Sequence, residues 1–101
     1  MDPRPLIIAL ALAACAGPDP RVQDAIASPS PRPGATRVAM DIVNRAGHGA
    51  IEIRIELRGA GRVIAAERTL ELDDKQTVHF ETDIETPPGS YTLRATAQYP
   101  D

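Results

Sequence analysis

Hydrophobic and polar residues alternate with a period of two along most of the chain from residue 36 onward. The clearest run covers residues 51–58, IEIRIELR, in which four aliphatic side chains alternate with four charged ones. Successive side chains of a β-strand point to opposite faces, so this run predicts a strand with one face in a core and the other in water. The inward set is Ile51, Ile53, Ile55 and Leu57, and the outward set is Glu52, Arg54, Glu56 and Arg58.

The same alternation predicts further strands over residues 38–44, 62–72, 77–84 and 91–99. Turn-forming residues separate them: Gly-Ala-Gly at 59–61, Asp-Asp-Lys-Gln at 73–76, and Pro-Pro-Gly at 87–89. We expect the last of these to be a type II turn, with glycine at the position where φ must be positive. None of these segments has a helical period, so residues 36–101 are expected to form a small antiparallel all-β sandwich. Its expected core is Ile53, Ile55, Leu57, Phe80, Tyr91 and Leu93.

The first 15 residues have a different pattern. A short head with Arg4 precedes an uninterrupted apolar run over residues 6–12, which is too short to span a bilayer as a helix. Head, run and following small residues are typical of a secretory signal. Leu12-Ala13-Ala14-Cys15 also resembles the lipobox of bacterial lipoproteins. The resemblance implies a signal peptide over residues 1–14, recognised by lipoprotein signal peptidase through Leu12, Ala13 and Ala14, and a lipidated Cys15 that becomes the new N-terminus.

Residues 15–35 are predicted to form a proline-rich tether. Two clusters, at 16–20 and 28–34, hold five of the ten prolines, a composition that favours extended chain and does not bury a core. About twenty such residues at roughly 3.1 Å each would reach up to about 60 Å from the bilayer. Residues 21–27, between the clusters, are also compatible with one or two turns of helix, which is marginal on its own.

Three parts of the domain carry a family resemblance. Asn44, the alternating run 51–57 and Gly61-Arg62-Val63-Ile64 resemble the opening of bacterial FxLYD- or CARDB-type immunoglobulin-like domains. Residues 88–95, PGSYTLRA, resemble the Pro-Gly-x-Tyr-x-Leu entry to a late strand of such sandwiches. The resemblance implies an immunoglobulin-like fold, a Tyr91 ring packed inward with its hydroxyl bonded to nearby backbone, and a role as a recognition or spacer module.

Composition narrows the function classes. The formal net charge is −3, with no basic surplus of the kind that nucleic-acid binding requires. Aromatic residues make up 3% of the chain and tryptophan is absent, so stacking platforms for single strands or sugars are not expected. A single cysteine excludes an intramolecular disulfide. We expect no cofactor and no small-molecule substrate.

Candidate catalytic and metal-binding residues are few. A nucleophile needs a base within hydrogen-bond reach, and Ser90 stands in a turn where serine is ordinary. His79, Glu81 and Asp83 share the outward face of one predicted strand, and His48 lies in a loop. With no close histidine pair and no cysteine ligand beside them, a solvated face is expected there rather than a metal site. The sequence therefore predicts a non-catalytic protein.

The expected function is a lipid-anchored module of the cell envelope that presents its sandwich to a protein partner, for example through an open sheet edge. In a Gram-negative host, Ala16 after the cysteine favours the periplasmic face of the outer membrane. The outward ladder of Glu52, Arg54, Glu56 and Arg58 is a possible partner-facing stripe or a solvated face. The alternative function is an exported protease inhibitor or a periplasmic strand-binding chaperone, with residues 59–61 or the His48 loop as its reactive element.

Overall fold

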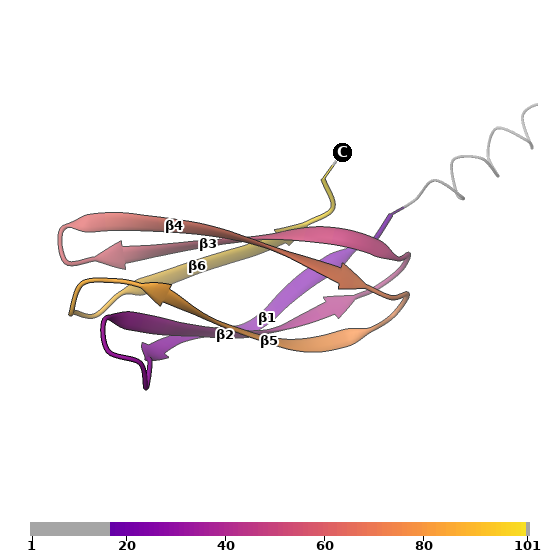
Figure 1. The fold of residues 1–101 in the computed structure, drawn as a ribbon. Coiled ribbons are helices and arrows are strands. Elements are labelled where there is room, and N and C mark those ends of the chain that lie inside the picture. Colours follow the sequence, from indigo (N-terminus) through magenta and orange to yellow (C-terminus); the bar gives the residue numbers. More distant parts are fainter. Residues whose placement is uncertain (1–16, 101) are drawn as a thin grey trace, which may run out of the picture.

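The computed structural model describes residues 17–100, and the predicted signal peptide and Cys15 lie outside them. The described chain forms two three-stranded antiparallel sheets packed as a small sandwich (Figure 1). One sheet has the strand order β1-β2-β5 and the other β4-β3-β6. The strands are β1 (Pro20–Pro29), β2 (Ala35–Asn44), β3 (Gly49–Gly59), β4 (Arg62–Leu72), β5 (Thr77–Glu85) and β6 (Thr92–Gln98).

The core lies between the two middle strands, as the alternation predicts. Every second side chain of β2 and of β3 is buried against the opposite sheet. Three of the six expected core residues, Ile53, Ile55 and Leu57, are at most 2% exposed. Phe80, Tyr91 and Leu93 pack against the core but are only partly buried. Phe80 and Leu93 lie on the edge strands β5 and β6, and Tyr91 lies in the loop just before β6. The buried apolar set is Val38, Met40, Ile42, Ile51, Ile53, Ile55, Leu57, Leu72 and Ile84.

The expectation of a tether, or of a short helix, is wrong for residues 20–29. This segment is strand β1, which pairs along its length with β2 and contributes Val22, Ala25 and Ala27 to the packing. A β-bulge between Gln23 and Ile26 shifts the register by one position, so the inward residues lose their period of two. Ile26, the largest apolar residue of the strand, is left 62% exposed. The folded body therefore begins well before residue 36.

Prolines do not prevent this strand because of where they stand. Pro20 and Pro29 are its first and last residues, and β1 is at the edge of its sheet. An edge strand directs half of its N–H groups away from its neighbour, so a missing N–H there costs no sheet hydrogen bond. Asp24 has φ 53°, the left-handed conformation of the bulge.

The predicted turns are confirmed at two of three places. Ala60 and Gly61 both have positive φ and close a two-residue hairpin between β3 and β4. At residues 73–76 the Gln76 N–H donates to the Asp73 carbonyl over 3.2 Å. The type II turn at 87–89 does not form: Gly89 has φ 147°, far from the value near +80° that this turn needs, and residues 86–91 make a wider loop.

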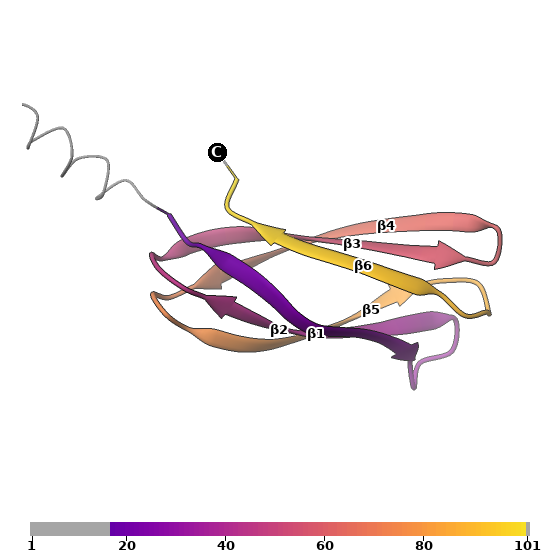
Figure 2. The ribbon, with the colours of Figure 1, turned by 180° about the vertical axis from the view of Figure 1, so that it is seen from behind.

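The two sides of the sandwich differ. On one side β1 runs beside β6 without a hydrogen-bonded ladder between them (Figure 2), and the small side chains of Ala25, Ala27, Ala95 and Ala97 pack there against the core. On the other side β4 and β5 diverge from the loop that joins them (Figure 1), and Ile64, Ala66, Leu70, Val78 and Phe80 stay only partly buried. We call this second side the open seam.

Replacing Ile55 by Ala is expected to lower the free energy of unfolding by about 2–5 kcal/mol, because it removes a fully packed side chain from the middle strand. Urea denaturation followed by circular dichroism measures the change. Val63→Ala is the control, since Val63 is 56% exposed and its truncation leaves no cavity. Equal effects of the two substitutions would contradict the assignment of the core.

Candidate functional site

The buried side chain of Asn44 ties the start of the described chain to two loops. Its Oδ1 accepts a hydrogen bond from the Asp19 N–H at 2.9 Å. Its Nδ2 donates to the carbonyls of Gly47 at 2.6 Å and Asp73 at 2.7 Å. Asn44 is 1% exposed, and both kinds of polar atom in its amide are satisfied, as burial of an amide requires. We call these four residues the Asn44 clamp.

Further contacts hold the same region. The Asp19 N–H also lies 3.0 Å from the Ala46 carbonyl, and the Arg45 N–H donates to the Asp19 carbonyl at 3.1 Å. The Arg45 guanidinium pairs with the Asp19 carboxylate at 3.1 Å on the surface. The Gly47 N–H donates to Asp74 Oδ1 at 2.8 Å. Residues 17–19 and the loops 45–48 and 73–76 are thus connected to one another, and we call this region the entry end.

Close backbone approach explains the glycines at the entry end. A Cβ on Gly47 would lie 2.4 Å from the Gly17 carbonyl oxygen, and φ at Gly47 is +80°. A Cβ on Gly17 would lie 2.2 Å from the ring of Tyr99, which covers the chain there. Pro18 is buried. The chain is therefore packed against the sandwich from Gly17 onward.

The sequence-predicted anchor residues are not placed. Leu12, Ala13, Ala14 and Cys15 lie outside the described residues, so their roles stay predictions. Among residues 17–100 no helix is long and apolar enough to cross a membrane.

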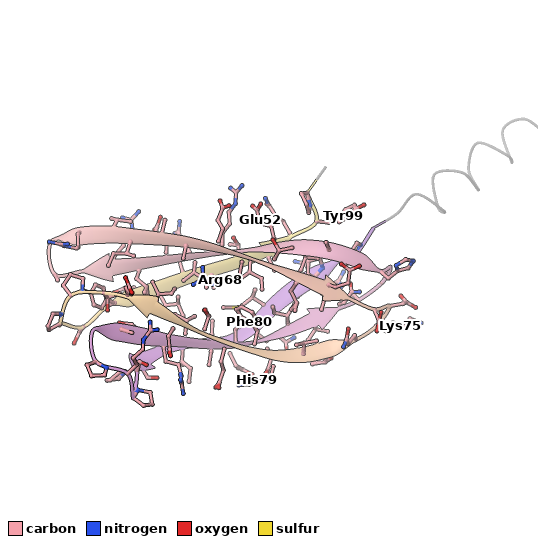
Figure 3. The ribbon with its side chains drawn as sticks, viewed as in Figure 1. Glu52, Arg68, Lys75, His79, Phe80 and Tyr99 are labelled. Carbon is pink, nitrogen blue, oxygen red and sulfur yellow. The ribbon has the colours of Figure 1, made fainter. Side chains whose placement is uncertain are left out.

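The charged ladder lies on the middle strand of its sheet and points outward, with Glu52 visible on that face in Figure 3. Its charges pair along the strand: Arg54 with Glu52 at 2.6 Å, and Arg58 with Glu56 at 2.7 Å. Arg54 also lies 3.7 Å from Glu67 on β4. The geometry brings the four predicted residues together as a mutually neutralised stripe.

The His79 group lies on the outer face of the other sheet, where Figure 3 shows the ring. Its Nδ1 is 2.9 Å from Asp41 Oδ1 on β2, and its Nε2 is 3.7 Å from Glu81 Oε2. The hydrogen bond to Asp41, aided by the charges of Asp41 and Glu81, raises the pKa of His79 above its ordinary value of 6.5. Sequence reasoning missed Asp41, which belongs to the neighbouring strand.

The third candidate metal ligand, Asp83, is engaged elsewhere. Arg37 donates to both carboxylate oxygens, at 3.0 and 3.2 Å, and these hydrogen bonds hold the pKa of Asp83 below its ordinary value. Across residues 17–100, no group of three or more histidine, cysteine, aspartate or glutamate side chains is arranged to hold a metal ion.

A hollow of about 460 Å³ lies at the end of the sandwich opposite the entry end, between the loops 30–34 and 86–91. The Thr36 and Thr86 hydroxyls are hydrogen-bonded to each other at 2.7 Å in its lining, and Ser90 and Arg32 also border it. The Tyr91 hydroxyl donates to the Pro87 carbonyl at 2.6 Å, which confirms the expected bond from this tyrosine to nearby backbone.

An inward-facing cation occupies the open seam. Arg68 takes an inner position on β4, between Ala66 and Leu70, and Figure 3 shows it between the sheets with Phe80. Its Nε donates to Thr82 Oγ1 on β5 at 3.1 Å, and its Nη1 donates to the Glu67 carbonyl at 2.9 Å. Within residues 17–100 it has no carboxylate partner within 4.0 Å. In the sequence, Arg68 stands at an inward position of the alternating pattern, between Ala66 and Leu70. This position could have marked it as an inward-facing cation, but the sequence prediction did not include it.

Comparison of the chain with protein-family models, with curated proteins and with solved structures found no match. Within residues 17–100 the fold offers free strand edges, a seam whose inward Arg68 is bonded to Thr82 and to the Glu67 carbonyl, and a first segment packed tightly at one end.

Replacing Asn44 by Ala is expected to lower the free energy of unfolding by about 1–3 kcal/mol, because it leaves the Gly47 and Asp73 carbonyls without their donor. Asn44→Asp keeps the acceptor for Asp19 but puts a carboxylate beside two carbonyl oxygens, so it should destabilise at least as much. Arg45→Ala is the control, since its ion pair is exposed and contributes about 0–1 kcal/mol. Chemical denaturation compares the three, and an Asn44→Ala effect no larger than that of Arg45→Ala would refute the clamp.

The His79–Asp41 contact predicts a small pH dependence. Because the folded-state pKa of His79 is raised, its stabilising contribution is complete below the unfolded pKa and is lost as pH rises through the folded pKa. Between pH 6 and 8, the melting temperature of the parent should therefore fall slightly more than that of Asp41→Asn. Because the His79 and Asp41 side chains are both exposed, this difference should be seen only at low salt. Thermal denaturation measures this, and an NMR titration of the His79 ring should give a lower pKa in Asp41→Asn. An unchanged His79 pKa in that variant would disprove the assigned cause.

Proposed function

We propose that the protein is a lipid-anchored, non-catalytic module of the cell envelope that binds an extended segment of a protein partner along the free edge of β4. The observation that carries the proposal is the open seam: an 11-residue edge strand beside an incompletely covered apolar row that contains Arg68. β-Augmentation uses such an edge, because main-chain hydrogen bonds supply affinity and alternate side chains supply specificity.

The anchor part of the proposal rests on the sequence. A short charged head, an apolar run over residues 6–12 and the lipobox-like Leu12-Ala13-Ala14-Cys15 support export and acylation at Cys15. Two or three acyl chains would hold the protein at a membrane far better than one. In a Gram-negative host, Ala16 directly after Cys15 favours sorting to the periplasmic face of the outer membrane.

We further infer that the sandwich is immunoglobulin-like, related to the FxLYD or CARDB type. The strand orders β1-β2-β5 and β4-β3-β6 are compatible with strands A-B-E and C′-C-F of such domains. The Tyr91 hydroxyl bond to backbone four residues upstream, before β6, is consistent with the tyrosine corner at strand F. Domains of this class commonly serve as recognition or spacer modules.

Among the four strand edges, β4 suits a partner best. β1 carries a bulge and terminal prolines, and β6 is flanked by β1. The outer row of β5 carries three carboxylates and a histidine at its five positions, a composition that resists pairing with another strand. The outer row of β4 has only two charges, Glu67 and Glu71. The ladder on β3 lies one strand farther in and its charges are already paired, so it is the weaker candidate for a docking stripe.

Arg68 defines the chemistry of the segment that fits. A strand added at the edge of β4 would place its inward side chains beside Ile64, Arg68 and Leu70, on the same face of the sheet. Covering Arg68 with apolar side chains alone would remove a charge from water without compensation. We therefore propose a segment with aliphatic inward residues and one aspartate or glutamate opposite Arg68, an arrangement that rejects indiscriminate apolar strands.

The strand-binding chaperone is a second candidate, because it would use the same seam on an unassembled subunit. The protease inhibitor has less support. Of its two candidate reactive elements, residues 59–61 form a two-residue turn, and Gly59 packs so closely on Ser90 that a Cβ there would lie 2.2 Å from the Ser90 carbonyl oxygen. The other, the His48 loop, is held at Gly47 by hydrogen bonds to Asn44 and Asp74.

Thr69→Pro should abolish partner binding while preserving the fold. Counted from the two-residue hairpin, Thr69 directs its N–H away from β3, so proline there removes a donor from the free edge only. Thr69→Val, which keeps the N–H, is the matched control. Pull-down from detergent-solubilised membranes with all three proteins measures the effect, and retention of the same partner by folded Thr69→Pro would exclude the β4 edge.

Cys15→Ser should release the protein from membranes into the soluble fraction, because no acyl group can then be attached. Fractionation of native-host cells, with immunoblotting, measures the distribution. Membrane retention equal to that of the parent would contradict the anchor.

A further inference from the structure

We propose that the anchored protein stands with its entry end directly on the lipid surface, with no intervening tether. This inference rests on the proposed acylation of Cys15. The occupant of the entry end is the headgroup layer of the membrane that holds the acyl chains. The far end and the β4 edge are then left open to a partner.

Chain length sets how far the domain can rise. Only Ala16 separates Cys15 from Gly17, and consecutive Cα atoms are about 3.8 Å apart, so two steps span at most about 7.6 Å. A spacer of about twenty extended residues would have allowed about 60 Å. Those residues are instead strand β1, so most of that reach does not exist.

The position of Gly17 on the sandwich is fixed by packing on several sides. The Tyr99 ring covers Gly17, and the Gly17 carbonyl lies against Gly47. Two residues later, Asp19 is held by the Asn44 clamp and by the Ala46 carbonyl. A greater distance between Cys15 and the entry end would require Gly17 and Asp19 to leave these contacts. The anchor point therefore stays close to the entry end.

The surface of the entry end is compatible with headgroups. Its cations Arg45 and Lys75 stand beside Asp19, Asp73 and Asp74, and Arg45 is already paired with Asp19. Tyr99 is 45% exposed beside the chain entry. Tyrosine, with an apolar ring and a polar hydroxyl, is a residue type enriched at membrane–water interfaces.

A single lysine allows a direct test. Lys75 is the sole lysine of the sequence and lies in the loop 73–76 of the entry end, where Figure 3 labels it. An amine-reactive fluorophore on the purified lipoprotein therefore reports the height of this end. The matched variant combines Lys75→Arg with Arg62→Lys, which moves the lysine to the exposed start of β4 at the far end and keeps the net charge. Lys75→Arg alone measures any labelling of the α-amine.

The measurement is fluorescence quenching in phosphatidylcholine vesicles that contain a headgroup-labelled quencher lipid. The label at Lys75 should be quenched severalfold more than the label at Arg62→Lys. A flexible Gly/Ser insert of about twelve residues between Ala16 and Gly17, with a root-mean-square span of about 20 Å, should reduce quenching at Lys75 toward the far-end level.

The outcomes separate the two proposals. Equal quenching at the two positions in protein that floats with the vesicles would overturn the orientation and leave the anchor intact. An unchanged signal at Lys75 after the insert would overturn it as well. Failure of the parent protein to float with the vesicles would instead refute acylation at Cys15, and the orientation would fall with it.

Discussion

The three hydrogen bonds of the buried Asn44 amide join the first strand to the loops at one end of the sandwich. A buried amide with one acceptor and two donors must find partners, and here the partners come from three separate segments of the chain. By accepting from Asp19 it fixes the start of β1, and by donating to Gly47 and Asp73 it closes both loops beside it. Together with the pairing of β1 along β2, these bonds make the first strand part of the sandwich and hold its start at the entry end.

The sequence predicts the strands whose inward and outward faces follow from a strict alternation of apolar and polar residues. Buried residues alternate with half-buried or exposed ones along residues 38–44 of β2 and 51–58 of β3, so the faces of both strands are predictable from the sequence. β1 was missed because a bulge moves its inward positions out of step and its prolines, which usually mark linkers, stand at the ends of an edge strand. Partial exposure of Phe80 depends on which strands lie at the edges, a property of topology rather than of local pattern.

The candidate site was less predictable for the same reason. Local pairs such as Arg54 with Glu52 follow from the spacing of one strand. Other contacts join different strands or loops, so they can be predicted only once the order and register of the strands are known. Examples are the contacts of Arg68 with Thr82, of His79 with Asp41 and of Asn44 with Asp19. We propose that the clamp fixes Asp19 close in sequence to the lipid anchor, and that the seam beside β4, with its inward arginine, selects a strand that carries a carboxylate.

Amide hydrogen exchange over residues 17–35 distinguishes a strand held by the Asn44 clamp from a solvated tether. We expect the amides of residues 21–28 that are bonded to β2, together with the Asp19 amide, to exchange slowly and to share the protection of the core strands β2 and β3. Exchange of these amides at the rates of an unstructured peptide, while β3 stays protected, would show that residues 17–35 are not part of the folded sandwich.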